Sequence, residues 1–594
     1  MKTHPPIQAL CLAVGLALAG PAFAVQIDFS GSNIYMKFLD GSHRLVSGGS
    51  IDTASGSDQG QFTELELRIT AKLSRQVEAG ARVQSRSSGA YWSEFGFANN
   101  EGFGGINQDT TTNPQISYNP NPLASKYMKL RGAYISLTPG YSWLDQALLG
   151  SSDWGMFDPF TVGKMRYIDR DNINGVYFRG PLGLAGSSYE LAWISLAEYL
   201  GPNFSTGNLR KNDGTVIGQF KVPLAGVRLT ASLQQTADRE RVAADTNLFD
   251  GQDTFTRFRN QVRSLRAEGS PLDGLDLRGA AYYSSYYVNE TVQTWSNLLG
   301  DDYNDTAYLL TADWSQTPLP GFGITLQYFD IGAGYVSAPG ARRESDVLLT
   351  EGSEAAWFGW GDPKYIGGLA NDMQQVPVTI RDNDFADFDE PGAESAIGWK
   401  GYTALLKSEV ANTPISFEAT RLDYNQNWQN WGGKQTVFNV IDWAGATGPG
   451  FKEDTDRKTD IFVVKVSHVF PVAGGLDTSA KWKRVADEDT ADATTAADDR
   501  ETTDNGYSVS VGNQLFADLY GSVSYGRYTR AISLGPSDFD NDKGIFSLRF
   551  AYNLTGLEFG TLAQWINGDG DPQQTGTEMS LDQYRLKAFA KVIF

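Results

Sequence analysis

The clearest pattern along the chain is an alternation of apolar and polar residues over short segments. From Leu65 to Leu73 every second residue is apolar, and the residues between them are charged or polar. The same alternation runs through 77–84, 227–234 and 275–281. In a β-strand, successive side chains point to opposite faces, so a repeat of two residues gives each face its own chemistry. These segments therefore predict strands with one apolar face and one mainly polar face.

Short turn sequences separate pairs of these segments. Proline and glycine recur in them because they supply the fixed and the permissive backbone angles that a tight hairpin needs. We count about ten such turns, one of them near Gln76. The clearest of the others are 223–226, 271–274, 318–321, 471–474, 516–518 and 554–556.

Long stretches rich in Asp, Asn, Gly, Ser and Thr alternate with the short turns. They lie at about 86–126, 197–214, 235–257, 287–303, 331–398, 425–457, 485–504 and 568–580. Short connections on one side and long loops on the other are typical of transmembrane β-barrels. Each of the ten turns joins two strands. With one more strand near 27–38 and one at the end of the chain, the pattern predicts about 22 strands, within a range of about 18 to 24. The predicted fold is an all-β, antiparallel transmembrane barrel with short periplasmic turns and long extracellular loops.

The last strand repeats the alternation up to the final residue. Tyr584, Leu586 and the other even-numbered residues through Phe594 form an apolar face, while Arg585 and Lys587 belong to the mainly polar face. A terminal aromatic residue on such a strand resembles the assembly signal of bacterial outer-membrane barrels. We therefore expect the barrel-assembly machinery to be a partner through this strand, and outer-membrane lipid, including lipopolysaccharide, to surround the barrel.

The amino-terminal residues have the features of a secretory signal. Lys2 precedes an apolar stretch, and Ala22, Phe23 and Ala24 form a small-x-small cleavage site. We expect residues 1–24 to be a signal peptide and 25–594 to form a single barrel domain without an amino-terminal plug. Cys11 is the only cysteine, so the mature chain is expected to contain no disulfide and no thiolate metal site.

Composition narrows the function classes. The formal net charge is −21, whereas nucleic-acid binding requires a basic footprint. A secreted soluble β-helix or propeller is disfavoured because no fixed repeat period is found. No apolar run is long enough for a membrane helix, and a closed barrel is the other structure that can cross a membrane. We therefore expect localisation in the bacterial outer membrane and no nucleic-acid partner.

No constellation of catalytic residues is found. His43 and His468, the two histidines after the expected signal peptide, are far apart in the chain; His43 is expected in a polar loop and His468 on an apolar face. The acids of 538–542 alternate as in a calcium loop, but Lys543 replaces the required glycine and Arg549 replaces the final glutamate. We expect no enzyme activity, no cofactor and no specific metal site.

Charge is segregated between strands and loops. Twelve of the fifteen charges expected to face the lumen are basic, although the whole chain is acidic. Lysine and arginine rings in a pore favour anions, and the low-dielectric wall focuses their field. The candidate pore-lining residues are Arg68, Lys72, Arg82, Arg228, Arg278, Lys465, Lys481, Lys483, Arg549, Arg585, Lys587 and Lys591.

The long stretch 331–398 is the candidate for a loop folded into the lumen. It carries a run of acids that would face the basic wall and form a constriction, weakening or reversing anion preference. The candidate constriction residues are Asp382, Asp384, Asp387, Asp389 and Glu390.

The signal end, the terminal strand and the hairpins between them resemble Gram-negative outer-membrane porins over the whole mature chain. The size of the chain and its expected basic lumen are similar to those of the substrate-specific porins, loosely the alginate-export type. Leu148-Leu149-Gly150 and the run 170–176 are weakly similar to a strand pair of that group. The resemblance implies passive transport through a channel and places no functional residue.

The leading interpretation is a porin for passive passage of small or oligomeric polar solutes, expected to be anionic. The alternative is a scaffold barrel that encloses an electron-transfer or export component. A hydrolase would require His43 or His468, and an energised receptor would require a plug domain before the first strand. Oligomerisation is compatible with the sequence, but no residue marks an interface.

Overall fold

The computed structural model shows a β-barrel built from most of the chain. The structure describes residues 26–51, 56–88, 106–108, 116–118, 128–152, 154–162, 173–184, 186–195, 214–237, 258–288, 302–315, 317–332, 335, 337, 399–424, 427–428, 451–452, 458–472, 474–489, 500–516, 518–571 and 576–594. The expected signal peptide and the acidic run 382–390 lie outside these residues. Within the described part, no helix is long and apolar enough to cross a membrane.

The first half of the barrel wall contains the shortest strands, β9 to β11. It is formed by β2 (Asn33–Ser47), β4 (Gly56–Lys72), β5 (Val77–Ser88), β8 (Met128–Leu137), β9 (Gln146–Ser152), β10 (Ile173–Pro181), β11 (Ser188–Ser195), β12 (Gly214–Leu224), β13 (Val227–Ala237), β14 (Phe258–Leu272) and β15 (Leu275–Val288). Short pieces outside the wall sequence are β1 (Gln26–Asp28), β3 (Ser50–Ile51), β6 (Ile106–Gln108) and β7 (Ile116–Tyr118).

The second half ends in longer strands. It is formed by β16 (Asp302–Trp314), β17 (Phe322–Ile331), β18 (Trp399–Val410), β19 (Thr413–Tyr424), β22 (Lys458–Phe470), β23 (Leu476–Asp489), β24 (Arg500–Phe516), β25 (Leu519–Leu534), β26 (Ser537–Leu554), β27 (Leu557–Gly570) and β28 (Met579–Ile593). A separate two-stranded piece pairs β20 (Asn427–Trp428) with β21 (Phe451–Lys452).

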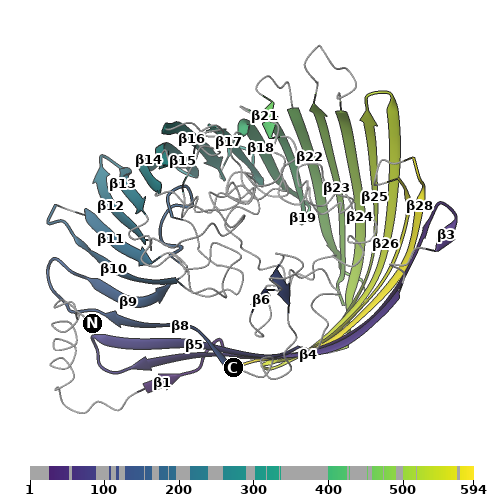
Figure 1. Ribbon diagram of the computed structural model, residues 1–594, viewed down its shortest axis with the longest axis horizontal. Coiled ribbons are helices and arrows are strands. Elements are labelled where there is room, and N and C mark those ends of the chain that lie inside the picture. The colour runs from purple at the N-terminus through teal and green to yellow at the C-terminus, as the bar shows by residue number, and fades with distance from the viewer. Residues whose placement is uncertain are drawn as a thin grey trace.

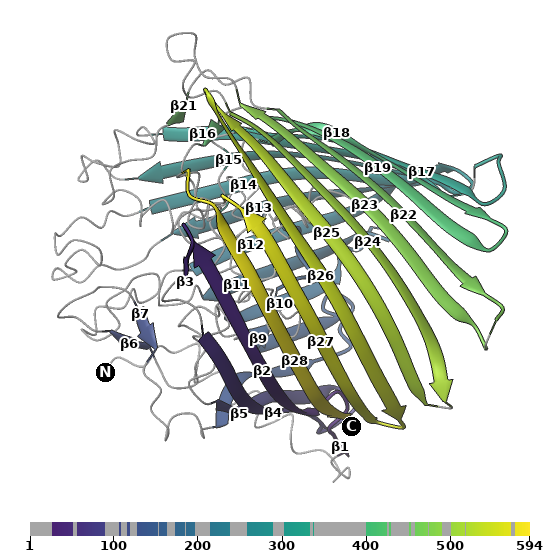
Figure 2. The same ribbon diagram turned by 90° about the vertical axis from the view of Figure 1, so that its right-hand side faces the viewer.

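The wall closes because its first and last strands pair with each other. β2 is antiparallel to β28 along its whole length, from Asn33 opposite Ile593 to Ser47 opposite Met579. Its other edge pairs with β4. Apart from the short β1 and β3, the main sheet is therefore a closed antiparallel barrel of 22 strands, as predicted. Figure 1 looks into the ring of strands, and Figure 2 shows β22 to β28 side by side at a common slant.

Tight turns join the strands in pairs on one side of the barrel. Ala225 and Gly226 connect β12 to β13 with φ of 49° and 85°, the angles of a type I′ turn that matches strand twist. Ala411 and Asn412 do the same between β18 and β19, with φ of 51° and 60°. The predicted turns at 271–274, 471–474 and 554–556 also lie between paired strands. These pairings confirm the predicted hairpins.

The opposite side is less uniform than predicted. The interval 535–536 between β25 and β26 is a tight turn, with Leu534 opposite Ser537. The acids of 538–542 consequently lie in β26 and not in a loop. Their alternation has the period of a strand and places Asp538, Asp540 and Asp542 on one face of β26. The predicted loop 485–504 is likewise shortened, because β23 continues to Asp489 and β24 begins at Arg500.

The two faces of the wall differ in chemistry. Leu233 and Leu265 point outward and are 48% and 56% exposed. Thr215, Gln234 and Asn260 point inward and are fully buried. An apolar outer face and a polar inner face are what a barrel in lipid requires. The alternation predicted for 227–234 is confirmed by these exposures.

Candidate functional site

The predicted pore-lining residues all lie on wall strands of the barrel. Residues that are opposite each other on paired strands share a face of the sheet, and this places each of these positions on the same inward face as Thr215 and Gln234. Arg228 opposite Glu268 and Lys465 opposite Lys481 are two such pairs. The remaining positions are Arg68, Lys72, Arg82, Arg278, Lys483, Arg549, Arg585, Lys587 and Lys591. Their role in a pore stays a prediction.

Several of these cations face carboxylates of the same wall. Glu66 is 4% exposed, and its Oε1 lies 2.9 Å from Arg68 Nε and 3.0 Å from Arg82 Nε. Arg228 Nη1 lies 3.9 Å from Glu268 Oε2, with both side chains largely open to solvent. The charge of this part of the lumen is therefore closer to balance than the sequence argument assumed.

The strands β22 to β28 carry the denser basic surface. Lys465 and Lys481 are direct cross-strand partners, an arrangement of like charges that disfavours the sheet unless something else compensates. Lys587 Nζ lies 6.0 Å from the ring centre of Tyr35 and 5.2 Å from that of Phe589. Cation–π contacts of this kind hold an ammonium group without neutralising its charge. The inward positions of β23 and β28 are thus rich in basic residues.

Sequence reasoning missed inward acids in the other half of the barrel. Glu190 on β11 is buried, and its two oxygens accept from Lys221 Nζ at 2.7 Å and Gln219 Nε2 at 2.6 Å. Glu190 shares the inward face with Ala192 and Ile194, while Leu191 and Trp193 lie on the outer face, so the run 191–194 is apolar on both faces. The sequence does not assign Glu190 to a face because the two-residue alternation that marks the other strands is absent in β11.

A segment folded against the inner wall was also missed. Residues 154–162, here called the inward segment, follow β9 and pack on Tyr177, Ile194 and Ile217 of the inward face. Trp154 is fully buried with φ of 57°, a left-handed angle that costs a non-glycine residue about 1–2 kcal/mol. Gly175 opposite it has room for no side chain, since an added Cβ would lie 2.4 Å from the Trp154 ring. The segment has no two-residue alternation of apolar and polar residues, so the pattern that predicts the strands does not mark it.

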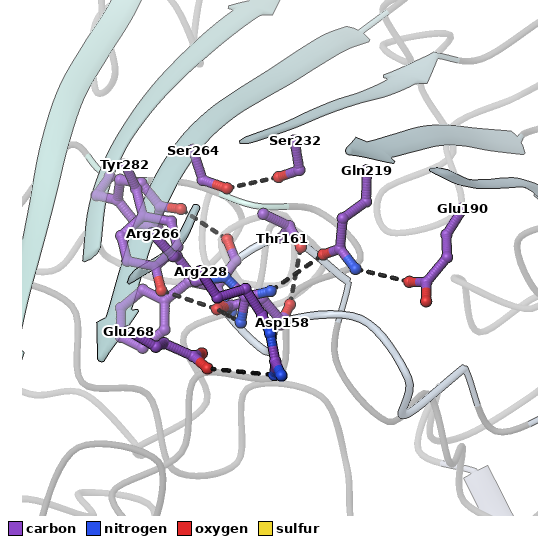
Figure 3. A network of polar contacts seen from close by, with 12 residues as sticks. Asp158, Thr161, Glu190, Gln219, Arg228, Ser232, Ser264, Arg266, Glu268 and Tyr282 are labelled. Atoms are coloured by element: carbon purple, nitrogen blue, oxygen red, sulfur yellow. Dashed lines mark hydrogen bonds and ion pairs between the residues drawn. The ribbon is translucent and has the colours of Figure 1, made fainter. Parts of the chain in front are cut away.

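Asp158 fastens the inward segment to the wall. Its Oδ1 accepts from Phe160 N at 2.8 Å, and its Oδ2 lies 2.9 Å from both Tyr282 Oη and Arg266 Nη1. Its backbone carbonyl accepts from Thr161 and Val162. Figure 3 shows these groups converging between β14, β15 and the segment. Partly buried charge-assisted bonds of this kind are among the stronger polar contacts in proteins.

The polar contacts continue along the wall beyond Asp158. Arg266 Nη2 donates to Gln219 Oε1 at 3.1 Å, and Gln219 in turn bonds Glu190. The series of contacts from Glu190 to Tyr282 therefore joins β11, β12, β14 and β15 to the inward segment (Figure 3). Such a connected network fixes the position of a segment more firmly than isolated contacts would.

The start of the long 331–398 stretch lies over the same segment. Tyr335 is fully buried and its hydroxyl donates to the Phe160 carbonyl at 2.6 Å. Ser337 Oγ donates to the Thr161 carbonyl at 2.7 Å. The rings of Phe160 and Tyr282 stack at 5.0 Å. The acids Asp382, Asp384, Asp387, Asp389 and Glu390 lie outside the described residues, so their place in a constriction stays a prediction.

Other candidate residues have structural positions. His43 lies in β2 and not in a polar loop, because β2 extends well beyond the predicted strand. His468 lies on the outward face, 2.8 Å from Thr413 and edge-to-face with Phe470. Tyr282 on β15 is buried inside the barrel at 3% exposure. In the described part, no group of three or more acids, histidines or cysteines could hold a metal ion.

No protein-family model and no curated protein matches the sequence. Among solved structures, the P pilus usher PapC translocation pore aligns over 94% of this chain and 100% of its own at 11% identity, with a TM-score of 0.32. OpdO of Pseudomonas aeruginosa aligns over 95% and 98% at 8% identity, with a TM-score of 0.31. BauA, the ferric preacinetobactin receptor of Acinetobacter baumannii, aligns over 96% and 80% at 10% identity, with a TM-score of 0.41. The fold assignment rests on the strand pairing of this chain itself.

The strand pairing and the faces of the wall define the class of the protein. A closed, even-numbered antiparallel barrel with an apolar outer surface and tight turns at one end is the architecture of bacterial outer-membrane proteins. The protein is an outer-membrane β-barrel.

Proposed function

We propose that this barrel is a channel for passive passage of small or oligomeric polar solutes, with a preference for anions. The observation that carries the proposal is the basic inward face of β22 to β28. Lys465 and Lys481 are cross-strand partners in this region, and Arg585 and Lys587 continue the basic face on β28. Lys483 lies beside them but is buried at 3% exposure.

Geometry supports the anion preference in this half. A charge on a low-dielectric wall acts on a passing ion with less screening than it would in bulk water. An acidic oligomer, such as the solute of the alginate-export porins that the chain resembles, would meet several of these cations in turn. Each contact would need to be weak enough for the solute to move on.

The test compares an inward and an outward cation on the same strand. Lys481→Gln removes a charge from the inner face of β23, and Arg484→Gln removes one from its outer face. Both variants change net charge equally. We expect the reversal potential in a salt gradient to shift toward cations for Lys481→Gln and to stay constant for Arg484→Gln. Equal shifts would mean that long-range charge, and not the inner wall, sets selectivity.

A barrel that sheathes a partner is the competing function. It predicts that the refolded chain alone passes no current, whereas a channel conducts alone. The same bilayer recording therefore separates the two functions.

A further inference from the structure

A cavity with a volume of about 950 Å³ lies at the loop end of β24 to β28. Two short connections also line it, namely 48–49 after β2 and 576–578 before β28. Gly48 N donates to the Glu578 carbonyl at 3.1 Å and joins these connections. Sites for organic ligands have volumes of about 300–1,000 Å³, so this cavity has room for more than a bare ion. The acids that line it are Asp540, Asp542, Asp569 and Glu578.

The cavity lies beyond the part of the wall that faces lipid. Phe546, Trp565 and Tyr584 are direct cross-strand neighbours on the outer face and are between 39% and 49% exposed. A row of large aromatic side chains on this face is typical of the membrane interface. Asp569 shares the outer face with Trp565 and lies roughly 13 Å further along β27 toward the loop end, at about 3.3 Å per residue. Polar solutes outside the bilayer therefore have access to this level of the wall.

The carboxylates of the cavity are only partly neutralised. Asp542 and Asp569 are direct cross-strand partners, and like charges in this arrangement destabilise a sheet unless a cation compensates. Arg527 Nε lies 2.8 Å from Asp542 Oδ2 and neutralises that carboxylate. Among the residues that the structure describes, no cationic side chain forms an ion pair with Asp540, Asp569 or Glu578. The cavity therefore carries excess negative charge.

One cation lines the cavity, but it already has a carboxylate partner. Arg530 is 2% exposed, and its Nε and Nη2 lie 2.5 Å and 2.6 Å from the two oxygens of Asp504. This bidentate pair is a strong contact. The charge of Arg530 is thus offset by Asp504 and leaves the cavity acids without compensation.

The buried amide of Asn541 points to a ligand independently of the acids. Asn541 lines the cavity and is 2% exposed. Neither its Nδ2 nor its Oδ1 has a hydrogen-bond partner within the described part of the chain, and a buried amide without partners is costly. β27 ends at Gly570 opposite Asn541, where an added Cβ would lie 2.5 Å from Asn541 Oδ1. A ligand in the cavity would supply the missing partners.

We propose that this cavity binds an organic polycation, a solute whose ammonium groups are separated by methylene chains. Asp540 and Asp569 each bind one ammonium group, and Asn541 Oδ1 accepts a hydrogen bond from the ligand. The acids come from neighbouring strands, so a solute with spaced charges matches them better than a compact ion does. Over the described ranges, no group of three or more acids could hold a metal ion. The site goes beyond the proposed channel, because binding at the rim requires no passage through the lumen.

The first test is a calorimetric titration of the folded barrel in detergent with spermidine. We expect one saturable site whose affinity falls with salt, as for other partly exposed charge pairs. Asp540→Asn and Asp569→Asn should each weaken binding on the order of tenfold, because each removes a charge-assisted contact. Asp330→Asn is the control, since it removes the same charge from the outer face of β17, where Asp330 pairs with Lys400. It should leave the affinity unchanged.

Three results of this titration would overturn the site. Absence of saturable heat would show that no polycation binds. Equal weakening by the control variant would show that net charge alone attracts spermidine. Displacement of spermidine by an equal concentration of magnesium would assign the acids to a metal ion and not to an organic ligand.

The second test separates a ligand contact of Asn541 from a structural role. Asn541→Leu replaces the amide by an apolar group of the same shape, so the urea midpoint without spermidine should stay constant or rise. Spermidine should raise the wild-type midpoint, because a ligand that binds only the folded state stabilises it, and should raise the variant's midpoint less. A lower midpoint of the variant without spermidine, or an equal rise in both chains, would overturn the role of Asn541. A barrel that binds spermidine but passes no current would refute the channel and leave this site standing.

Discussion

A charge placed on the outer face of β13 tests two assignments together: which residues face the lipid, and how deep in the membrane each of them lies. Leu233 is 48% exposed and lies near the middle of β13, whereas Leu229 lies close to the turn at 225–226. The two are separated by roughly 13 Å along the strand at about 3.3 Å per residue. With a tilt of about 45°, that is roughly 9 Å of depth in the membrane.

The depth difference sets the expected magnitudes. An arginine facing lipid costs about 2–4 kcal/mol at mid-membrane and about 0–1 kcal/mol near the interface. Leu233→Arg should therefore lower the free energy of unfolding by about 2–4 kcal/mol, and Leu229→Arg by about 0–1 kcal/mol. Leu233→Ala separates the lost apolar contact from the charge, and should cost less than Leu233→Arg.

The assay is a urea titration of the barrel in lipid vesicles, followed by tryptophan fluorescence and by the gel mobility shift of the folded form. Each variant is compared with the wild type at the same lipid ratio. Equal costs for Leu233→Arg and Leu229→Arg would refute the assigned depth. A negligible cost for both would refute the outward face itself.

Three further predictions concern single sites. Gly175→Ala would place a methyl group against the Trp154 ring and the Trp193 carbonyl and should cost about 1–3 kcal/mol of unfolding free energy in the same titration; an unchanged midpoint would contradict this close packing around Gly175. Ala411→Gly relieves a left-handed alanine in a tight turn and should stabilise by up to about 1 kcal/mol, while destabilisation would contradict the turn type. Tyr282→Phe removes a donor from buried Asp158 and should cost about 1–3 kcal/mol, with no cost arguing against that hydrogen bond.

The barrel could be predicted because each wall strand has a local alternation of apolar and polar residues. Strand parity at 227–234 and turn residues such as Gly226 depend only on neighbours in sequence. The predicted loops 331–398 and 425–457 lie between the strand ends that the structure shows. Boundaries failed where strands extend past the usual length, as at β26, because polar outer residues above the lipid look like a loop.

The interior could be predicted only in part. Inward lysines such as Lys481 follow from strand parity, but ion pairs such as Lys221 with Glu190 and Arg228 with Glu268 join different strands. Asp158 meets Arg266 and Tyr282 across more than a hundred residues, and nothing local to Asp158 marks that meeting. The inward segment 154–162 carries no period, so its packing inside the barrel depends on tertiary contacts alone.

The most direct test of the central claim is planar-bilayer recording of the refolded wild-type chain under a salt gradient. If the protein is an anion-preferring channel, the recording should show stable conductance steps and a reversal potential whose sign indicates that anions pass more readily than cations. Steps with cation preference would contradict the basic wall as the source of selectivity. Absence of current from a correctly folded barrel would contradict the channel.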